Sequence, residues 1–246
     1  CATLFTNDEA IQFWRNNNTG TVENISLTNS IIADPLYRPE TLTNPTTGQP
    51  YKGHWERGVP ERDHNYGMLI GYGCKRVDLQ HNLFTNVYWR GPMLDADTTT
   101  VVANNVSVNG RLGCHIQCNN TNGPVLNTTV GYMQISGANA STRRGTTFKF
   151  HNGSAATPTL PANTKCWVSN LYGVQGAKST YTTPYSQVVG RADSTTLAAV
   201  ESAALVNTSL PVSNRPIDVQ TPVVALSQDD LYNRARLNAG PRPKEI

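Results

Sequence analysis

The chain has 246 residues, 15% of them charged, and a formal net charge of +3 at pH 7. An average soluble domain has roughly 25% charged residues. The Asn, Thr, Ser and Gly that fill the difference disfavour a helix bundle and favour many short strands joined by polar turns. No basic stripe with interleaved aromatic residues occurs, so we expect no nucleic-acid partner. No apolar run reaches about 18 residues, so we expect no membrane span.

The chain opens at Cys1 on a segment with the pattern of a fold interior, CATLFTNDEAIQFW at 1–14. We therefore expect this chain to be truncated at its N-terminus, with earlier coils and any export signal lying upstream. Four later segments share a loose repeat, in which apolar residues at period two precede a turn with Asn and further apolar residues. They are 22–32, 74–84, 98–108 and 163–173. Repeats of about 20–25 residues built from short strands indicate a β-solenoid.

Asparagine recurs at the turns of this repeat, and Asn82 and Asn105 lie 23 residues apart. Asparagine tolerates the left-handed backbone conformation, and its side chain can bond to equivalent residues in the coils above and below. We therefore interpret five turn asparagines as structural: Asn29, Asn82, Asn86, Asn105 and Asn109.

Two stretches break the repeat and divide the chain into 1–175 and 176–246. Residues at about 35–63 are polar and rich in Pro and Gly. This composition predicts a loop that projects from one coil and lies over a binding face. Residues 176–222 are rich in Ser, Thr, Pro and Val and predict an extended tail packed along the solenoid. A short helix is expected at 227–239, where Ser227 caps its N-terminus and Gly240 ends it.

The five cysteines are Cys1, Cys74, Cys114, Cys118 and Cys166, an odd count without the spacing of a disulfide framework. Cys114 and Cys118 flank the sequence HIQ. In a strand their sulfurs would lie about 13 Å apart, too far to bond, whereas in a loop they could pair. A metal site would need a second ligand pair. Our default interpretation is that the cysteines are small buried apolar residues.

Several motifs together resemble the pectate lyases. The central one is HNLFTNVYWRGP at 81–92, which is similar to the H-N-x-F-x-x-x-x-x-R-x-P segment of that family. It is preceded by MLIG and followed by VVANNVSVN at 101–109, in the order found in the family. The opening NDEAIQFW and the closing DLYNRARLNAGPRP at 230–243 are also similar. The resemblance covers most of 1–175 and resumes at the end of the chain.

This resemblance implies an all-β fold, a single-stranded right-handed parallel β-helix with a short C-terminal helix. It also implies a secreted, monomeric polysaccharide lyase that cleaves pectate (polygalacturonate) by calcium-assisted β-elimination. The chemistry is coherent, because the C5 proton lies α to a carboxylate and a cation on that carboxylate stabilises the developing enolate.

Individual roles follow from the same resemblance. Arg90 takes the position of the catalytic base; the alternative is a surface arginine that pairs with Asp95 or Asp97. The expected Ca²⁺ ligands are acidic side chains, whose oxygens suit this ion: Asp8, Glu9 and Asp34. The family's substrate-binding lysine has no clear counterpart here, and Lys52 or Arg62 in the inserted loop could take its role. His64, just after the loop, occupies a family-like position, and Trp89 adjoins Arg90 as a further expected substrate-binding residue. Four aromatic side chains near the cleft would stack on sugars or cap the solenoid's side: Trp55, Tyr66, Tyr88 and Trp89. His81 fits a turn-packing role better than a ligand role.

Two positions depart from the family pattern. Gln12 replaces an acid, and Asp95 replaces an arginine that would face an anionic substrate, which should weaken uronate binding. These departures favour an alternative, a β-helix carbohydrate-binding or adhesion protein without catalysis. Another alternative is a glycoside hydrolase, because Asp95 and Asp97 would point to the same side of a strand and that chemistry needs paired carboxylates.

Overall fold

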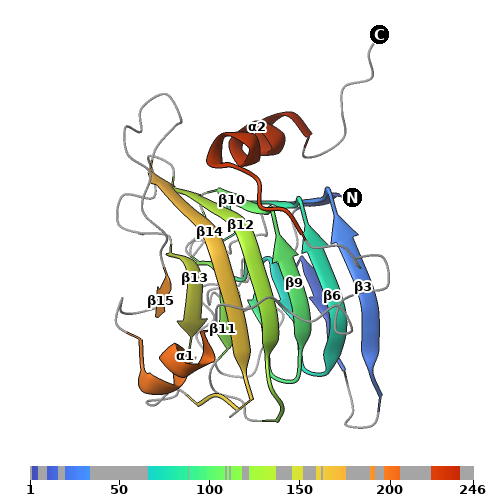
Figure 1. Ribbon diagram of the computed structural model, residues 1–246. Helices are drawn as coiled ribbons and strands as arrows, with labels where there is room; N and C mark the ends of the chain where they lie inside the picture. The colour runs from blue at the N-terminus through green and yellow to red at the C-terminus, as the bar shows by residue number, and fades with distance from the viewer. Residues whose placement is uncertain are drawn as a thin grey trace, which may run out of the picture.

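The computed structural model describes residues 2–4, 10–15, 20–33, 66–87, 89–108, 110, 112–117, 122–136, 146–151, 159–161, 163–175, 189–191, 197–205 and 223–238. Their secondary structure is mostly β, in two sheets with parallel pairing (Figure 1). A mostly β fold with parallel sheets is therefore confirmed. The inserted loop at about 35–63 lies outside the described residues, as does most of 176–222. No helix among the described residues has the length and apolarity to cross a membrane.

The larger sheet has nine strands. They are β1 (Ala2–Leu4), β3 (Val22–Thr28), β4 (Ile31–Ala33), β6 (Cys74–Gln80), β7 (Leu83–Thr85), β9 (Thr99–Ala103), β10 (Val106–Val108), β12 (Leu126–Ser136) and β14 (Lys165–Gln175). The long strand β12 joins the two halves of this sheet, because its first part pairs with β9 and its last part with β10. Figure 1 shows β3, β6, β9, β12 and β14 side by side.

The smaller sheet has six strands in chain order. They are β2 (Ile11–Phe13), β5 (Met68–Ile70), β8 (Met93–Leu94), β11 (Leu112–Gln117), β13 (Thr146–His151) and β15 (Val189–Arg191). Strand β15 comes from the segment expected to be an extended tail, and it pairs with β13. That part of the tail therefore continues the smaller sheet.

The sequence repeat corresponds to stacked strands of the larger sheet. Segments 22–32, 74–84 and 98–108 follow one another in register, with Val22 beside Cys74 and Val77 beside Thr100. The fourth segment, 163–173, does not stack on the third. It pairs with β12, a strand that the repeat did not include.

The main core lies between the sheets and takes side chains from both. Its largest fully buried members include Leu79, Phe84, Tyr132, Phe148 and Phe150.

Cys74, Cys114 and Cys166 are buried free thiols in this core, as the default interpretation predicted, and Cys1 and Cys118 lie outside the described residues. Burial raises the pKa of Cys74 to about 11 and that of Cys114 to about 12. Both therefore stay protonated at neutral pH and are poor nucleophiles.

A stack of left-handed residues lies at the turn in the middle of each pass through the larger sheet. Its members have positive φ: Asn29 (48°), His81 (58°), Asn104 (53°), Gly131 (65°) and Asn170 (50°). In the first three passes the turn separates two strands, whereas in β12 and β14 it lies inside one strand. His81 is therefore a turn residue, as expected, and burial, followed by the charge of Arg234, lowers its pKa to about 4.

The asparagines that follow this turn form a ladder through the sheet. The Asn105 Oδ1 atom accepts a hydrogen bond from the Asn82 backbone N–H at 2.8 Å, and Asn82 Oδ1 accepts from that of Ser30 at 3.0 Å. The same amides donate to the carbonyls of Leu79 and Leu27 at 2.8 and 2.9 Å.

The structural role predicted for Asn82 and Asn105 is confirmed, although the left-handed residue is the one before each of them. Asn29 and Asn86 (φ 54°) do adopt the left-handed conformation. Asn109 lies outside the described residues.

Two helices pack against the strands: α1 (Ala199–Ala204), which leads into a bridge between Leu205 and Cys166, and α2 (Gln228–Asn238). The predicted C-terminal helix is confirmed, and Ser227 caps it by accepting from the Asp230 N–H at 3.1 Å. Leu231 is fully buried against Val106 and Met133. Asn104 holds the approach to α2 through bonds to Val224 and Leu226.

The ladder predicts the effect of replacing Asn105 with alanine. The substitution leaves the Asn82 N–H and the Leu79 carbonyl buried without their partner, and each such group costs about 1–3 kcal/mol. We expect the free energy of unfolding, measured by denaturant titration, to fall by about 2–5 kcal/mol. Asn233→Ala on the exposed face of α2 is the control and should change stability by less than about 0.5 kcal/mol. Equal losses for the two variants would refute the ladder's role.

Candidate functional site

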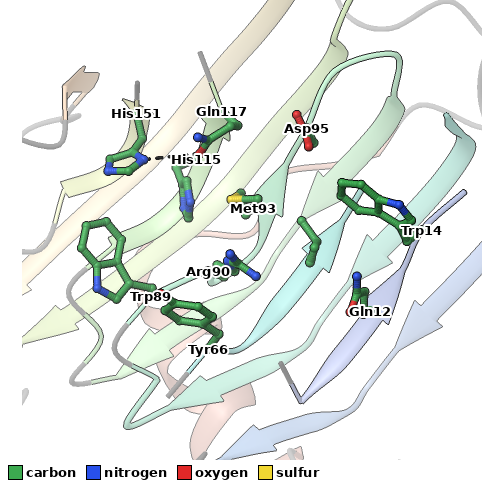
Figure 2. Close-up of a pocket in the computed structure, with 11 residues that line it drawn as sticks. Gln12, Trp14, Tyr66, Trp89, Arg90, Met93, Asp95, His115, Gln117 and His151 are labelled. Carbon is green, nitrogen blue, oxygen red and sulfur yellow. Dashed lines mark hydrogen bonds between the residues drawn. The ribbon is translucent and has the colours of Figure 1, made fainter. Parts of the chain in front are cut away.

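A groove of about 520 Å³ lies on the face of the smaller sheet that points away from the core (Figure 2). Its floor follows the register of four strands, because Gln12, Leu69, Met93 and His115 are successive cross-strand neighbours. The residues that alternate with them, such as Ile70 and Ile116, are in the core. The other lining residues are Trp14, Tyr66, Trp89, Arg90, Asp95, Gln117 and His151. The predicted residues Arg90 and Trp89 therefore lie in one groove.

Arg90 lies near the centre of the groove in Figure 2, directly before a cis Gly91–Pro92 bond. Its guanidinium carbon is 4.1 Å from the centroid of the Tyr66 ring, within cation–π distance. The backbone around it is tied to β5, because the Trp89 and Arg90 carbonyls accept from the Gly67 and Met68 N–H groups at 2.9 and 2.7 Å. The buried Tyr132 hydroxyl donates to the Gly91 carbonyl. These contacts fix the segment that presents Arg90 to the groove.

The two aspartates expected to lie on one side of a strand point to different places. Asp95 lines the groove, whereas Asp97 pairs with Lys75 at 2.5 Å and with Arg15 at 3.7 Å. The cause is local, because β8 ends at Leu94 and Asp97 has a positive φ of 57°. The expected i, i+2 alignment is wrong, and so is the idea that Arg90 pairs with Asp97, whose ion-pair partners are Lys75 and Arg15.

A histidine pair lies beyond Met93. The rings of His115 and His151 have centroids 5.9 Å apart, and the Trp89 ring lies 5.0 Å from that of His151. His151 Nδ1 is 3.3 Å from the Gln117 amide oxygen. Lys149, almost fully buried, is the cross-strand neighbour of His115. The pKa of His115 lies well below its usual value because the ring is buried and because His151, Arg90 and Lys149 add positive charge nearby.

Trp14 lines the side of the groove opposite the histidine pair in Figure 2. Its side chain is 43% exposed, and its indole occupies the space that a side chain on Gly71 would need. Glycine at 71 therefore lets the indole lie against the backbone at the end of β5. An exposed indole held in this way is a suitable surface for stacking on a sugar ring, since it is rigid and mostly apolar.

The remaining predicted site residues fall outside the described part of the chain. They are the three expected metal ligands, Asp8, Glu9 and Asp34, the loop residues Lys52 and Arg62, and His64 just after the loop, with Trp55 and Tyr88 among the aromatics. The two departures from the family pattern, Gln12 and Asp95, both line the groove. They therefore face whatever the groove binds.

Among the lining residues that the sequence-based prediction did not assign to the site are Trp14, His115 and His151. The alternation in LGCHIQ and TTFKFH carries the signal, because it sets His115 and Gln117 on one face of their strand and Lys149 and His151 on one face of theirs. The missing information was that these two strands are neighbours.

The described groove does not by itself fit a calcium site. Ca²⁺ takes six to eight oxygen ligands. Asp95 is the one carboxylate among the described lining residues, and its Oδ1 atom already accepts from the Ala96 N–H at 2.7 Å. No group of three or more His, Cys, Asp or Glu side chains suited to a metal occurs in the described part of the chain. We therefore derive no reaction step through a metal.

Comparisons with protein-family models, with curated proteins and with solved structures find no match for this chain.

The packing of Trp14 on Gly71 predicts the effect of Gly71→Ala. The added methyl group displaces the exposed indole while leaving the core untouched. We expect a changed tryptophan fluorescence spectrum, a loss of stability under about 1 kcal/mol, and, by isothermal titration, weaker binding of any saccharide that stacks on this indole. In a Trp14→Ala background the same substitution should have no further effect on binding. An additive loss in the double variant would contradict the proposed contact.

Proposed function

We propose that this chain is a secreted, monomeric polysaccharide lyase that acts on pectate by β-elimination. The observation that carries the proposal is the position of Arg90, which lies centrally in an aromatic-lined groove on the outer face of a parallel sheet. The resemblance to pectate lyases assigns the catalytic position to this same arginine. A guanidinium is well suited to the carboxylate of a uronate residue, and the groove's indole and phenol rings are suited to sugar faces.

We also propose that the two sheets belong to a right-handed parallel β-helix. The chain visits the smaller sheet, then the first and second halves of the larger sheet, in the same order on successive passes. Examples are β5, β6 and β7, followed by β8, β9 and β10. Each strand pairs in parallel with its counterpart in the next pass. This repetition and the asparagine ladder support a solenoid.

The proposed reaction removes the C5 proton of a galacturonate unit and expels the glycosidic oxygen from C4. The negative charge that develops on the carboxylate needs a positive partner in place before the reaction. Arg90 supplies that charge, and the resemblance also assigns it the role of base. Because a guanidinium has a pKa above about 12, Arg90 can take the proton only through its rare neutral form, or the proton passes to another group.

The proposal includes calcium only as an ion that Asp8, Glu9 and Asp34 would bind, since these are the ligands implied by the resemblance. Ca²⁺ bound to the uronate would add positive charge at the carboxylate. Removing calcium with a chelator tests this part of the proposal separately from the role of Arg90.

The second candidate is a carbohydrate-binding or adhesion protein that uses the same groove without catalysis. Two observations favour it, because Gln12 and Asp95 line the groove where the family has an acid and an arginine. Glycoside hydrolysis has less support, since Asp97 is paired with Lys75 and Arg15 and does not line the groove with Asp95.

Elimination creates a double bond conjugated with the carboxylate, so ultraviolet absorbance of the product separates it from hydrolysis. We expect the protein to produce this signal on polygalacturonate, and Arg90→Ala to reduce the rate by about 10²-fold or more. Arg76→Ala is the matched control, because Arg76 also has a positive φ, 52°, and pairs with Glu23 at 2.5 Å outside the groove.

Three other outcomes would count against the proposal in different ways. Equal activity of the two arginine variants would remove Arg90 from the reaction. Reducing ends without ultraviolet absorbance would indicate hydrolysis. Binding to polygalacturonate without either product would favour the binding protein.

A further inference from the structure

A neutral imidazole lies in the same groove as Arg90. His115 projects from β11 on the groove side, and Figure 2 shows its ring between Arg90 and His151. Its neighbours across the sheet are Met93 on β8 and Lys149 on β13. The ring is almost fully buried, 1% exposed, and lies at the groove floor beside the residue that the proposed function places at the uronate.

One contact of His115 favours a particular tautomer of its ring. Its Nδ1 atom is 3.5 Å from the Gly113 carbonyl oxygen. A carbonyl can only accept, so the long contact favours the ring form with hydrogen on Nδ1. The Nε2 atom of that tautomer carries a lone pair and accepts protons.

From this geometry we infer that His115 is the proton acceptor of the elimination, with Arg90 holding the uronate carboxylate. The inference rests on the proposed function. It gives the C5 proton an acceptor other than Arg90, whose guanidinium has a pKa above about 12. In the reaction the C5–H bond breaks and an N–H bond forms on Nε2. The electron pair becomes the C4=C5 double bond as the C4–O4 bond breaks. The leaving oxygen takes a proton from water, and the imidazolium returns its proton to the resulting hydroxide.

The charged and titratable groups around His115 favour its neutral form before the reaction. Arg90 precedes β8, and Lys149 and His151 are on β13. Asp95, which follows β8, is the one carboxylate among the described residues that line the groove. On the other side of β11, Tyr132 is part of the core. Burial and three nearby basic groups lower the pKa of His115 well below 6.5, so the ring is unprotonated at neutral pH.

The test measures kcat and KM for elimination of polygalacturonate as a function of pH. We expect His115→Gln to lower kcat by about 10²–10⁴-fold, the usual contribution of a general base, with little change in KM. His81→Asn is the matched control and should retain activity, because it replaces a histidine outside the groove and asparagine tolerates the positive φ of 58°. If the wild type eliminates and His115→Gln has the same kcat, the inference fails and the proposed function stands.

A second variant keeps the test valid if His115→Gln does not fold. The wild-type rate should fall as the pH drops through the pKa of His115, since only the neutral ring accepts a proton. Lys149→Met removes one of the charges that depress this pKa, so the acidic limb of kcat should move to higher pH. An unmoved limb would show that another group is the base. A wild type that forms no elimination product would overturn both the proposed function and the inference.

Discussion

The register between successive passes of the chain is the constraint on which the rest of the structure depends. In a parallel stack, one wrong step would place every inward side chain on the outer face. Here the register is held inside the larger sheet by amide side chains that bond to the backbone of the neighbouring pass, such as Asn105 to Asn82 and Asn82 to Ser30. Aliphatic residues alone would fill the core in more than one register, because apolar contact is not directional. The buried amides specify a single alignment.

The groove is a consequence of that alignment. Gln12, Leu69, Met93 and His115 are far apart in sequence, yet the parallel register sets them in one row across β2, β5, β8 and β11. The same register brings Lys149 of β13 beside His115. No loop has to fold over the sheet to create this row. The position of each chemical group is therefore as exact as the strand pairing that carries it.

The sequence predicted the parts of the fold that repeat locally. The alternation in 74–84 and 98–108, the structural role of Asn82 and Asn105 and the capped helix near Ser227 are all found in the structure. Strand β12 was not predicted, because its turn residue is Gly131 (φ 65°), whereas the repeat in the sequence is defined by an asparagine at the turn. The site was predicted in part, because Arg90 and Trp89 belong to one motif. His115 and His151 were not found, because no fixed sequence period relates their strands: the neighbours Met93 and His115 are 22 residues apart, whereas the neighbours His115 and Lys149 are 34 apart.

Comparing Arg90 with Arg76 shows that backbone strain and function are separate properties of a residue. A left-handed non-glycine residue costs about 1–2 kcal/mol, and both Arg76 and Arg90 adopt this conformation. The Arg76 N–H donates to Thr99 Oγ1 of β9 at 2.5 Å, and the side chain pairs with Glu23 of β3. Both contacts join neighbouring strands, so the left-handed conformation of Arg76 contributes to the packing of the larger sheet. At Arg90 the backbone bonds to β5 and the Tyr132–Gly91 bond oppose the strain, while the side chain turns into the groove. Positive φ alone therefore does not mark a functional residue. What distinguishes Arg90 is that the fold stabilises its backbone while its charge faces the groove beside His115.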